Sequence, residues 1–187
     1  MLRDNVSDVQ TVQEIREKPS MTVPVSPSIH NGGIMNIDIK RIPEDQLKQK
    51  PQDSELGFGK IFTDYMFEMK YKENRDWYDP VIRKYSSLSF DPSTIVFHYA
   101  QTIFEGLKGY YRDDGKIGLF RADQNFKRFN RSATRMCMPN IPEEDQKQAI
   151  FELLKLEKDW FPKAENTTMY IRPLMIGTAP RLGVHSS

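Results

Sequence analysis

Two stretches carry most of the information in this sequence, FHYAQTIFEGLKGYY (residues 97–111) and MYIRPLMIGTAPRLGV (residues 169–184). The first runs into DDG (residues 113–115), after which apolar residues resume over 116–121. Glycine accepts positive φ, so Asp-Asp-Gly between two such runs predicts a β-hairpin. The second stretch predicts a further strand over residues 167–177.

The remaining elements follow from hydrophobic periodicity. Alternation over FGKIFTDYMFEMKYK (residues 58–72) predicts a half-buried strand, and residues 80–90 predict its return. Residues 123–136 predict a helix with Asp123 as its N-cap, and residues 142–162 predict a second helix that a proline opens and another proline ends. Strand pairs, two helices and a final strand predict an α+β fold, a mainly antiparallel sheet with packed helices.

Composition divides the chain into two parts. Residues 1–55 are polar and proline-containing and predict a largely irregular leader, whereas residues 56–187 hold most of the aromatic side chains and predict one folded domain. The 27 basic and 26 acidic residues give a net charge of +1. No global field therefore draws the protein to nucleic acid or to an anionic membrane.

The sequence also argues against several kinds of site and location. Cys137 is the only cysteine, so an internal disulfide and a cysteine-based zinc site are excluded. The three histidines show no metal-ligand spacing, and no metal site is expected. No apolar run reaches the ~18 residues that span a bilayer, and the acidic residues of the first 19 positions fit neither a signal nor a transit peptide. A cytoplasmic location is expected.

Three arginines of the first predicted helix form one candidate site. Arg128, Arg131 and Arg135 follow one another at spacings of three and four, opposite the apolar stripe. They would form a solvated basic face, or one of them would turn into a cleft to hold a phosphate, which the planar guanidinium does well. The residues alone leave both interpretations open.

A second candidate is the pair Tyr170 and Arg172. In a strand their side chains leave the same face, with Ile171 on the other. A phenol beside a guanidinium can bind a carboxylate or cover an apolar substrate. The alternative is a cation–π or surface pair at a sheet edge.

These segments, in this order, resemble branched-chain amino acid aminotransferases, pyridoxal phosphate (PLP) enzymes of the class IV type. The resemblance rests on residues 97–111, on LFRADQNFKRFNRSA (residues 119–133), similar to LFRPxxNxxRxxRSA, and on residues 169–184, similar to YxRPxxIGTxPxLGV. Ala122 stands where the family usually has proline, and Ala179 where glutamate is common.

The resemblance implies a role for several residues. It implies that Arg128 contacts the PLP phosphate and that Arg172 receives the side-chain carboxylate of glutamate. Aromatic residues are ordinarily core, but here the resemblance implies that some line the substrate pocket. The substrate-binding residues implied in this way are Phe58, Tyr99, Phe104, Tyr170 and Arg172.

The resemblance also implies a reaction and a division of the enzyme. Such enzymes move an amino group from leucine, isoleucine or valine to 2-oxoglutarate, work as dimers and have a small and a large domain. Their Schiff-base lysine lies further along than residue 187, so this chain is expected to be the amino-terminal half, the small domain, without a catalytic residue of its own. The alternative is a non-catalytic short isoform that associates with the full-length enzyme. A relative acting on D-amino acids or aminodeoxychorismate would share the fold, but the motifs together favour branched-chain substrates.

Overall fold

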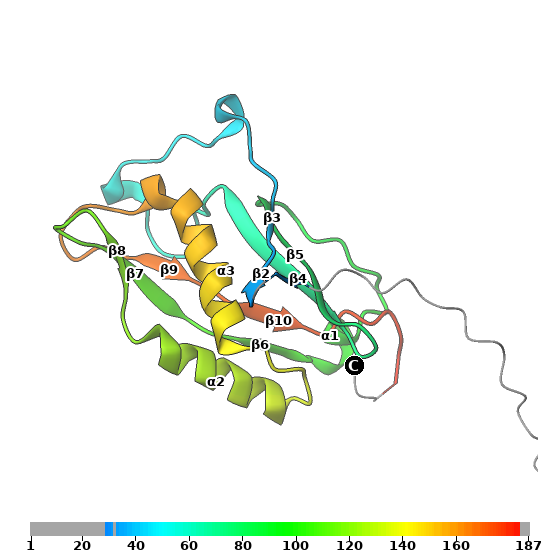
Figure 1. Ribbon diagram of the computed structural model, residues 1–187. Coiled ribbons are helices and arrows are strands. Elements are labelled where there is room, and N and C mark those ends of the chain that lie inside the picture. Colours follow the sequence, from blue (N-terminus) through cyan, green and yellow to red (C-terminus); the bar gives the residue numbers. More distant parts are fainter. Residues whose placement is uncertain (1–28, 32, 184–187) are drawn as a thin grey trace, which may run out of the picture.

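The computed structural model describes residues 29–31 and 33–183 (Figure 1). Expectations for residues 1–28, 32 and 184–187 lie outside the described part. The strands are β1 (His30–Asn31), β2 (Ile34–Met35), β3 (Asp38–Ile39), β4 (Tyr65–Lys72), β5 (Asp76–Lys84), β6 (Thr102–Phe104), β7 (Leu107–Tyr111), β8 (Ile117–Leu119), β9 (Met169–Ile171) and β10 (Leu174–Ile176). The α-helices are α1 (Ile95–Tyr99), α2 (Ala122–Arg135) and α3 (Glu143–Leu156), and the 3-10 helices are η1 (Glu44–Gln46), η2 (Asp53–Glu55) and η3 (Lys158–Trp160).

The strands form small sheets that are mainly antiparallel. Two have three strands, in the orders β3-β5-β4 and β8-β7-β9, and two are the pairs β1-β2 and β10-β6. Of the strand pairs described, β3 with β5 is parallel and the others are antiparallel. Helix α2 packs on α3 and on β6, while α3 packs on β4 (Figure 1). The predicted α+β class is confirmed.

The hairpin after the FEGLK segment forms as predicted. Strand β7 pairs with β8, and the turn between them has Gly115 at φ +76°, a conformation that glycine adopts without steric cost. The helix that follows begins differently from the prediction. Arg121 is the N-cap of α2, in the left-handed region at φ 50°, and no side chain caps the helix. Asp123 therefore lies inside the first turn, where its carboxylate accepts a hydrogen bond from Gln124 Nε2 at 2.6 Å.

The strand predicted over residues 58–72 is shorter in the structure. It begins only at Tyr65, and the residues before it form no regular element. Asp64 explains the change, because its buried carboxylate faces inward, where Oδ1 accepts from the Lys48 N–H at 2.9 Å and Oδ2 from Trp160 Nε1 at 2.7 Å. A side chain used in this way ties together a loop and a helix end instead of continuing the alternation of a strand.

Two other strands differ from the sequence prediction. The return strand, predicted over 80–90, is β5 and lies earlier in the chain, because the turn at residues 73–75 is tight. The strand predicted over 167–177 is divided into β9 and β10, which belong to different sheets. The interruption falls at Arg172 and Pro173, and proline has no N–H with which to continue a ladder.

Three groups of buried side chains make the core. The stripe on α2 is confirmed for Phe126, Phe129 and Ala133, which are buried, whereas Met136 at the helix end is 39% exposed. The three groups are Trp77, Ile103, Phe129, Ala133, Met138 and Met175; Leu107, Phe126, Ile150, Leu154, Phe161 and Ile171; and Ile42, Tyr65 and Ile82.

Part of the expected leader belongs to this core. Met35 is 2% exposed, and its backbone exchanges two hydrogen bonds with the amide of Gln148 on α3, at 2.8 and 2.6 Å. Ile42 is buried, and its N–H donates to Tyr65 Oη at 3.0 Å. Packing in the described residues therefore does not change at residue 55, where composition placed the boundary.

Glu157, at the C-terminal end of α3, is a buried carboxyl group. The residue is 2% exposed, Oε1 accepts from the Tyr65 N–H at 2.5 Å, and Oε2 has no hydrogen-bond partner among the described residues. Burial raises the pKa of Glu157 because it disfavours the charged form, and the neighbouring Asp64 charge raises it further. The sequence predicted that only the stem of Glu157 faces the core; in the structure the carboxyl is buried as well. Among the described residues, no helix is long and apolar enough to cross a membrane.

We predict that Glu157→Gln keeps or raises the stability of the fold near neutral pH, because it keeps an acceptor for the Tyr65 N–H and removes a buried charge. Since the folded-state pKa is raised, protonation of Glu157 stabilises the fold below the unfolded pKa, and this contribution is lost as the pH rises through the folded pKa. The gain of the variant over the natural chain should therefore be larger at about pH 8 than at about pH 5.

Urea unfolding followed by tryptophan fluorescence measures this difference. Glu157→Ala serves as the contrast, because it leaves the Tyr65 N–H unpaired and should lower the free energy of unfolding by on the order of 1–3 kcal/mol. A glutamine variant that is less stable than the natural chain at both pH values would contradict the prediction.

Candidate functional site

The candidate site lies where two pairs of strands are interrupted together. Strand β6 pairs with β10 and β7 pairs with β9, so the chain changes sheets at residues 105–106 and again at residues 172–173. These two interruptions face each other, and the Glu105 N–H donates to Pro173 O across them at 2.9 Å. The backbones of the FEG and YIRP segments therefore meet at one point, and the side chains there are free to leave the alternation of a strand.

Four of the sequence-predicted site residues gather beside this point. Arg172 Nη2 donates to Tyr170 Oη at 2.8 Å, and the guanidinium carbon of Arg172 lies 4.3 Å from the centroid of the Phe104 ring. The ring of Phe58 meets that of Tyr170 edge-on, with 5.1 Å between the centroids. We call Phe58, Phe104, Tyr170 and Arg172 the aromatic–arginine cluster.

The cluster lies at the surface. Phe58 is 73% exposed, Phe104 60% and Tyr170 38%. These aromatic rings are therefore not core residues, the ordinary role of an aromatic side chain. An exposed set of large apolar rings beside a guanidinium marks a binding surface.

Gly106 allows the backbone to approach Tyr170 closely. A Cβ added at this glycine would lie 2.4 Å from Tyr170 Oη, closer than real contacts allow. Gly106 was not predicted to take part in the site, although the signal was present in the FEG motif. Its small size helps to set the position of the Tyr170 ring.

Arg128 is held by a buried carboxylate. Its Nε donates to Glu105 Oε1 at 2.5 Å and its Nη2 to Glu105 Oε2 at 2.7 Å, a bidentate pair. Glu105 is 4% exposed, whereas the side chain of Arg128 is 58% exposed. Nη1 of Arg128 makes no hydrogen bond with any residue in the described ranges, so this nitrogen can still bind an anion.

Further donors surround the Glu105 carboxylate. Asn125 Nδ2 donates to Oε2 at 2.9 Å and the Gly106 N–H at 3.2 Å. Burial by itself would raise the pKa of Glu105, but the hydrogen bonds from Arg128, Asn125 and Gly106 outweigh it and hold the pKa below the ordinary value. In turn, the carboxylate raises the pKa of Arg128. Glu105 is therefore charged at neutral pH, and it too was missed in the sequence.

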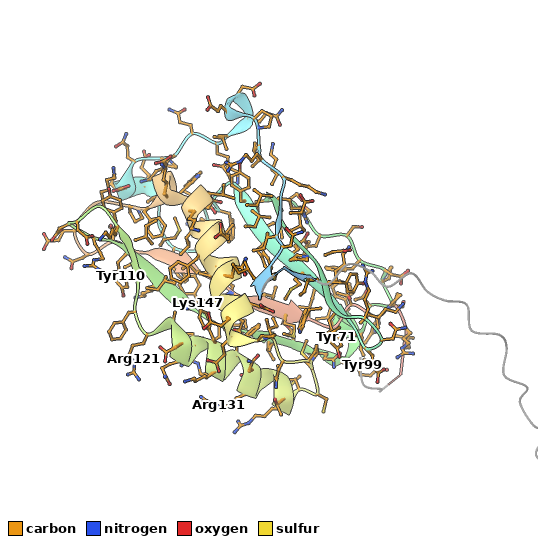
Figure 2. The ribbon with its side chains drawn as sticks, in the orientation of Figure 1. Tyr71, Tyr99, Tyr110, Arg121, Arg131 and Lys147 are labelled. Carbon is orange, nitrogen blue, oxygen red and sulfur yellow. The ribbon has the colours of Figure 1, made fainter. Side chains whose placement is uncertain are left out.

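The other two arginines of the predicted basic face do not join the site. Arg131 and Arg135 are exposed, and Figure 2 shows Arg131 on the side of α2 that faces away from the sheets. For these two residues the interpretation as a solvated face fits, and Arg128 differs from them because Glu105 is within its reach.

Tyr99 lies apart from the cluster. Its Oη accepts a hydrogen bond from the Gly183 N–H at 2.9 Å, and its ring lies 6.4 Å from that of His98. In the described part of the chain no ring contact or hydrogen bond joins Tyr99 to the four residues of the cluster. The structure thus brings together four of the five predicted substrate-binding residues.

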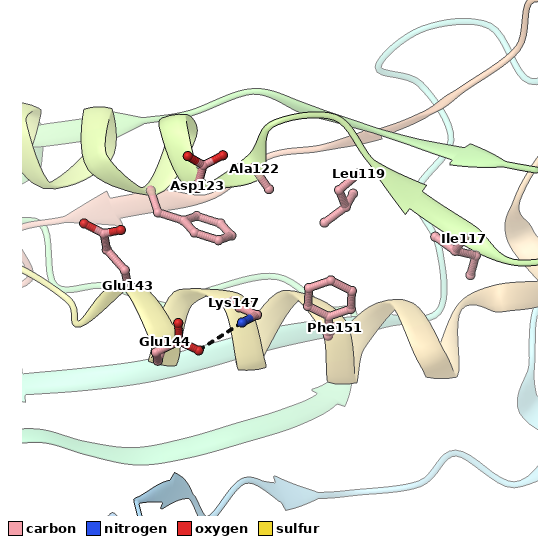
Figure 3. A pocket seen from close by; sticks show the side chains of 9 residues that line it. Ile117, Leu119, Ala122, Asp123, Glu143, Glu144, Lys147 and Phe151 are labelled. Carbon is pink, nitrogen blue, oxygen red and sulfur yellow. Dashed lines mark hydrogen bonds and ion pairs between the residues drawn. The ribbon is translucent and has the colours of Figure 1, made fainter.

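A separate shallow pocket of about 280 Å³ lies between β8 and the first turns of α2 and α3 (Figure 3). Lys147, on its wall, is paired with Glu144 at 3.1 Å. The lining residues are Ile117, Leu119, Ala122, Asp123, Phe126, Glu143, Glu144, Lys147 and Phe151. None of the predicted site residues lines this pocket, so we place the candidate site at the cluster. The search of the described residues found no group of His, Cys, Asp and Glu side chains that could hold a metal ion.

An arginine fixed by a buried carboxylate, next to apolar rings and a second arginine, defines a site for a small organic anion with an apolar part. No protein-family model matches the chain. Over 153 residues it is 53% identical to branched-chain-amino-acid transaminase 1 of Bacillus subtilis (strain 168), an alignment that covers 82% of this chain and 43% of that protein.

Two further relatives agree. Identity is 48% over 140 residues with branched-chain-amino-acid aminotransferase 2 of the same organism, covering 75% of this chain and 39% of that protein. With the cytosolic branched-chain-amino-acid aminotransferase of Saccharomyces cerevisiae it is 43% over 145 residues, covering 77% and 39%. This chain is a homologue of the branched-chain amino acid aminotransferases, and it spans about two fifths of the length of these relatives.

Solved structures give a looser match. A bacterial branched-chain amino acid aminotransferase (T.th.), complexed with N-(5'-phosphopyridoxyl)-L-glutamate, aligns with 56% of this chain and 33% of its own at 25% identity. The TM-score of 0.47 is too low to carry a structural argument.

We predict that Gly106→Ala displaces the Tyr170 ring, because the new methyl group would meet Tyr170 Oη, and that the Arg172–Tyr170 hydrogen bond is lost. The ring can move toward solvent, so the cost in stability should be on the order of 1 kcal/mol. The NMR resonances of the ¹³C-labelled Tyr170 ring, assigned with Tyr170→Phe, should shift. Gly118→Ala is the matched control, since its methyl group would meet only the flexible Arg112 side chain. Unchanged Tyr170 resonances in Gly106→Ala would contradict the prediction.

Proposed function

We propose that this chain forms part of a PLP-dependent aminotransferase that moves an amino group between leucine, isoleucine or valine and 2-oxoglutarate, with glutamate as the shared donor. The homology supports the class of reaction. The observation that carries the proposal is the aromatic–arginine cluster, in which two apolar rings face a hydrogen-bonded phenol and guanidinium.

Such a cluster suits substrates of two kinds. Phe58 and Phe104 offer apolar surface, and burying one branched aliphatic side chain is worth ~1.5–3 kcal/mol. Glutamate needs a cation for its side-chain carboxylate, and the Arg172 guanidinium supplies one. Since Arg172 lies over the Phe104 ring, a small movement would exchange an apolar wall for a charged one. We place Tyr99 in the same pocket on the resemblance alone.

Arg128 is the residue of this chain that we assign to the PLP phosphate. Its guanidinium is partly exposed, fixed in direction and has Nη1 available, which fits one phosphate oxygen. When bound, PLP supplies the electron sink of the reaction. A single charged hydrogen bond of ~1.5–3 kcal/mol does not retain the cofactor by itself. The other phosphate donors and the catalytic lysine are therefore assigned to parts of the enzyme that lie outside the aligned two fifths.

The exposure of the cluster supports a covering partner. Rings as open as Phe58 and Phe104 would be covered by another part of the enzyme or by a second subunit, and we propose a homodimer located in the cytoplasm. The alternative is a non-catalytic form that uses the same apolar surface to associate with a complete enzyme. Nucleic acid and membrane are not among the proposed partners.

We predict that the purified polypeptide of 187 residues does not transaminate, because no lysine in it matches the family nucleophile. With PLP, leucine and 2-oxoglutarate, no glutamate should form in a coupled assay. Bacillus subtilis transaminase 1 serves as the positive control. Turnover of leucine by the polypeptide would contradict the assignment of the lysine to another part of the enzyme.

We predict that Arg172→Ala impairs glutamate more than leucine, because only glutamate presents a carboxylate to this side chain. In a chimera that continues this chain with the remaining part of Bacillus subtilis transaminase 1, kcat/KM for glutamate should fall roughly 10- to 100-fold, the worth of a charged hydrogen bond. Leucine should lose less than that, and Arg131→Ala, on the exposed side of α2, should affect neither donor. Equal losses for the two amino donors would remove this role from Arg172.

A further inference from the structure

Glu105 joins the two halves of the candidate site. Through its side chain it binds Arg128 on α2, and through its N–H it binds Pro173 O, next to Arg172. The residue after it, Gly106, lies against the Tyr170 hydroxyl. One dipeptide therefore contacts the arginine proposed for the cofactor phosphate and the tyrosine proposed for the substrate.

We infer that Glu105 is a positioning residue that fixes the Arg128 guanidinium for an anion. The inference rests on the proposed role of Arg128. An arginine on an exposed helix face samples many rotamers, and ordering them when an anion binds weakens the binding. The bidentate pair with Glu105 orders the side chain beforehand and leaves Nη1 directed outward, away from the two bonded nitrogens.

A contrary effect of Glu105 must be weighed against this. A carboxylate next to Arg128 lowers the positive potential that an anion meets, so Glu105 could act as a competitor for the guanidinium. Two observations favour positioning. Glu105 is 4% exposed, so an anion cannot displace it into water. Its charge is also shared among Asn125, the Gly106 N–H and two nitrogens of Arg128, which reduces the repulsion that reaches the exposed side.

Asn125 completes the arrangement. Its amide donates to Glu105 Oε2 at 2.9 Å and to Gly106 O at 3.2 Å, so it holds the side chain of one residue and the backbone of the next. Because Asn125 precedes Arg128 by three positions, both lie on one face of α2 and reach the same carboxylate. The pair Asn125 and Arg128 thus fixes the register of α2 against the interruption between β6 and β7.

The two effects of Glu105 predict opposite results for Glu105→Gln, which keeps the shape and removes the charge. The full chain of 187 residues is titrated with pyridoxine 5'-phosphate, which has the ring and phosphate of the cofactor but no aldehyde to react with surface lysines. The observed signal is the Arg128 Nε–H, assigned with Arg128→Lys, and the Arg131 Nε–H is the internal control. Positioning predicts an apparent Kd that is roughly three- to tenfold weaker in Glu105→Gln, the cost of ordering one long side chain. Glu105→Asp, which keeps the charge but is too short to hold both nitrogens, should weaken binding in the same way.

The outcomes separate this inference from the proposed function. If the natural chain shows no shift of Arg128 on titration, the phosphate role of Arg128 fails and the positioning role fails with it. If the natural chain binds and Glu105→Gln binds equally well or more tightly, only the positioning role is overturned, and Glu105 is a competitor. A urea midpoint close to that of the natural chain establishes that each variant is folded. Weaker binding by both folded variants supports the inference.

Discussion

The buried charge of Glu105 is the constraint on which the candidate site depends. Burying a carboxylate costs several kcal/mol unless donors surround it, and this one has four: two from Arg128, one from Asn125 and one from the Gly106 N–H. Helix α2 can satisfy them only in one rotation about its axis and at one height along the strands. The same interruption in the strands brings Glu105 under α2 and Gly106 under the Tyr170 ring. The position of both halves of the site therefore follows from satisfying one charge.

A second buried acidic pair organises the opposite end of α3. Asp64 accepts from the Lys48 N–H and from Trp160 Nε1, while Glu157 accepts from the Tyr65 N–H. These bonds join the segment before β4 to the end of the helix that packs on it. They explain why residues of low hydrophobicity before position 65 belong to the domain, since polar contacts as well as Ile42 hold them in place.

The site is a surface of this chain rather than an enclosed cavity. The aromatic–arginine cluster is exposed, and the pocket between β8 and the helices is lined by none of the predicted site residues. An aminotransferase must exclude water from the reacting atoms. In the proposed function this chain contributes one wall, with an apolar and a charged part, and the remaining walls come from the parts of the enzyme to which the homology does not extend.

The sequence by itself determined the features that depend on neighbouring residues. The β7–β8 hairpin follows from the DDG turn, the buried stripe of α2 from helical spacing, and the contact of Tyr170 with Arg172 from strand alternation. Four of the five substrate residues meet in the structure, although the roles assigned to them and to Arg128 remain predictions. Only the tertiary structure decided that the predicted 167–177 strand breaks at Pro173, that Glu105 turns inward to Arg128, and that Phe58 meets Tyr170. The physical reason is that a local period fixes which way a side chain points, whereas the partner of a buried charge or an exposed ring is chosen by packing between segments far apart in the chain.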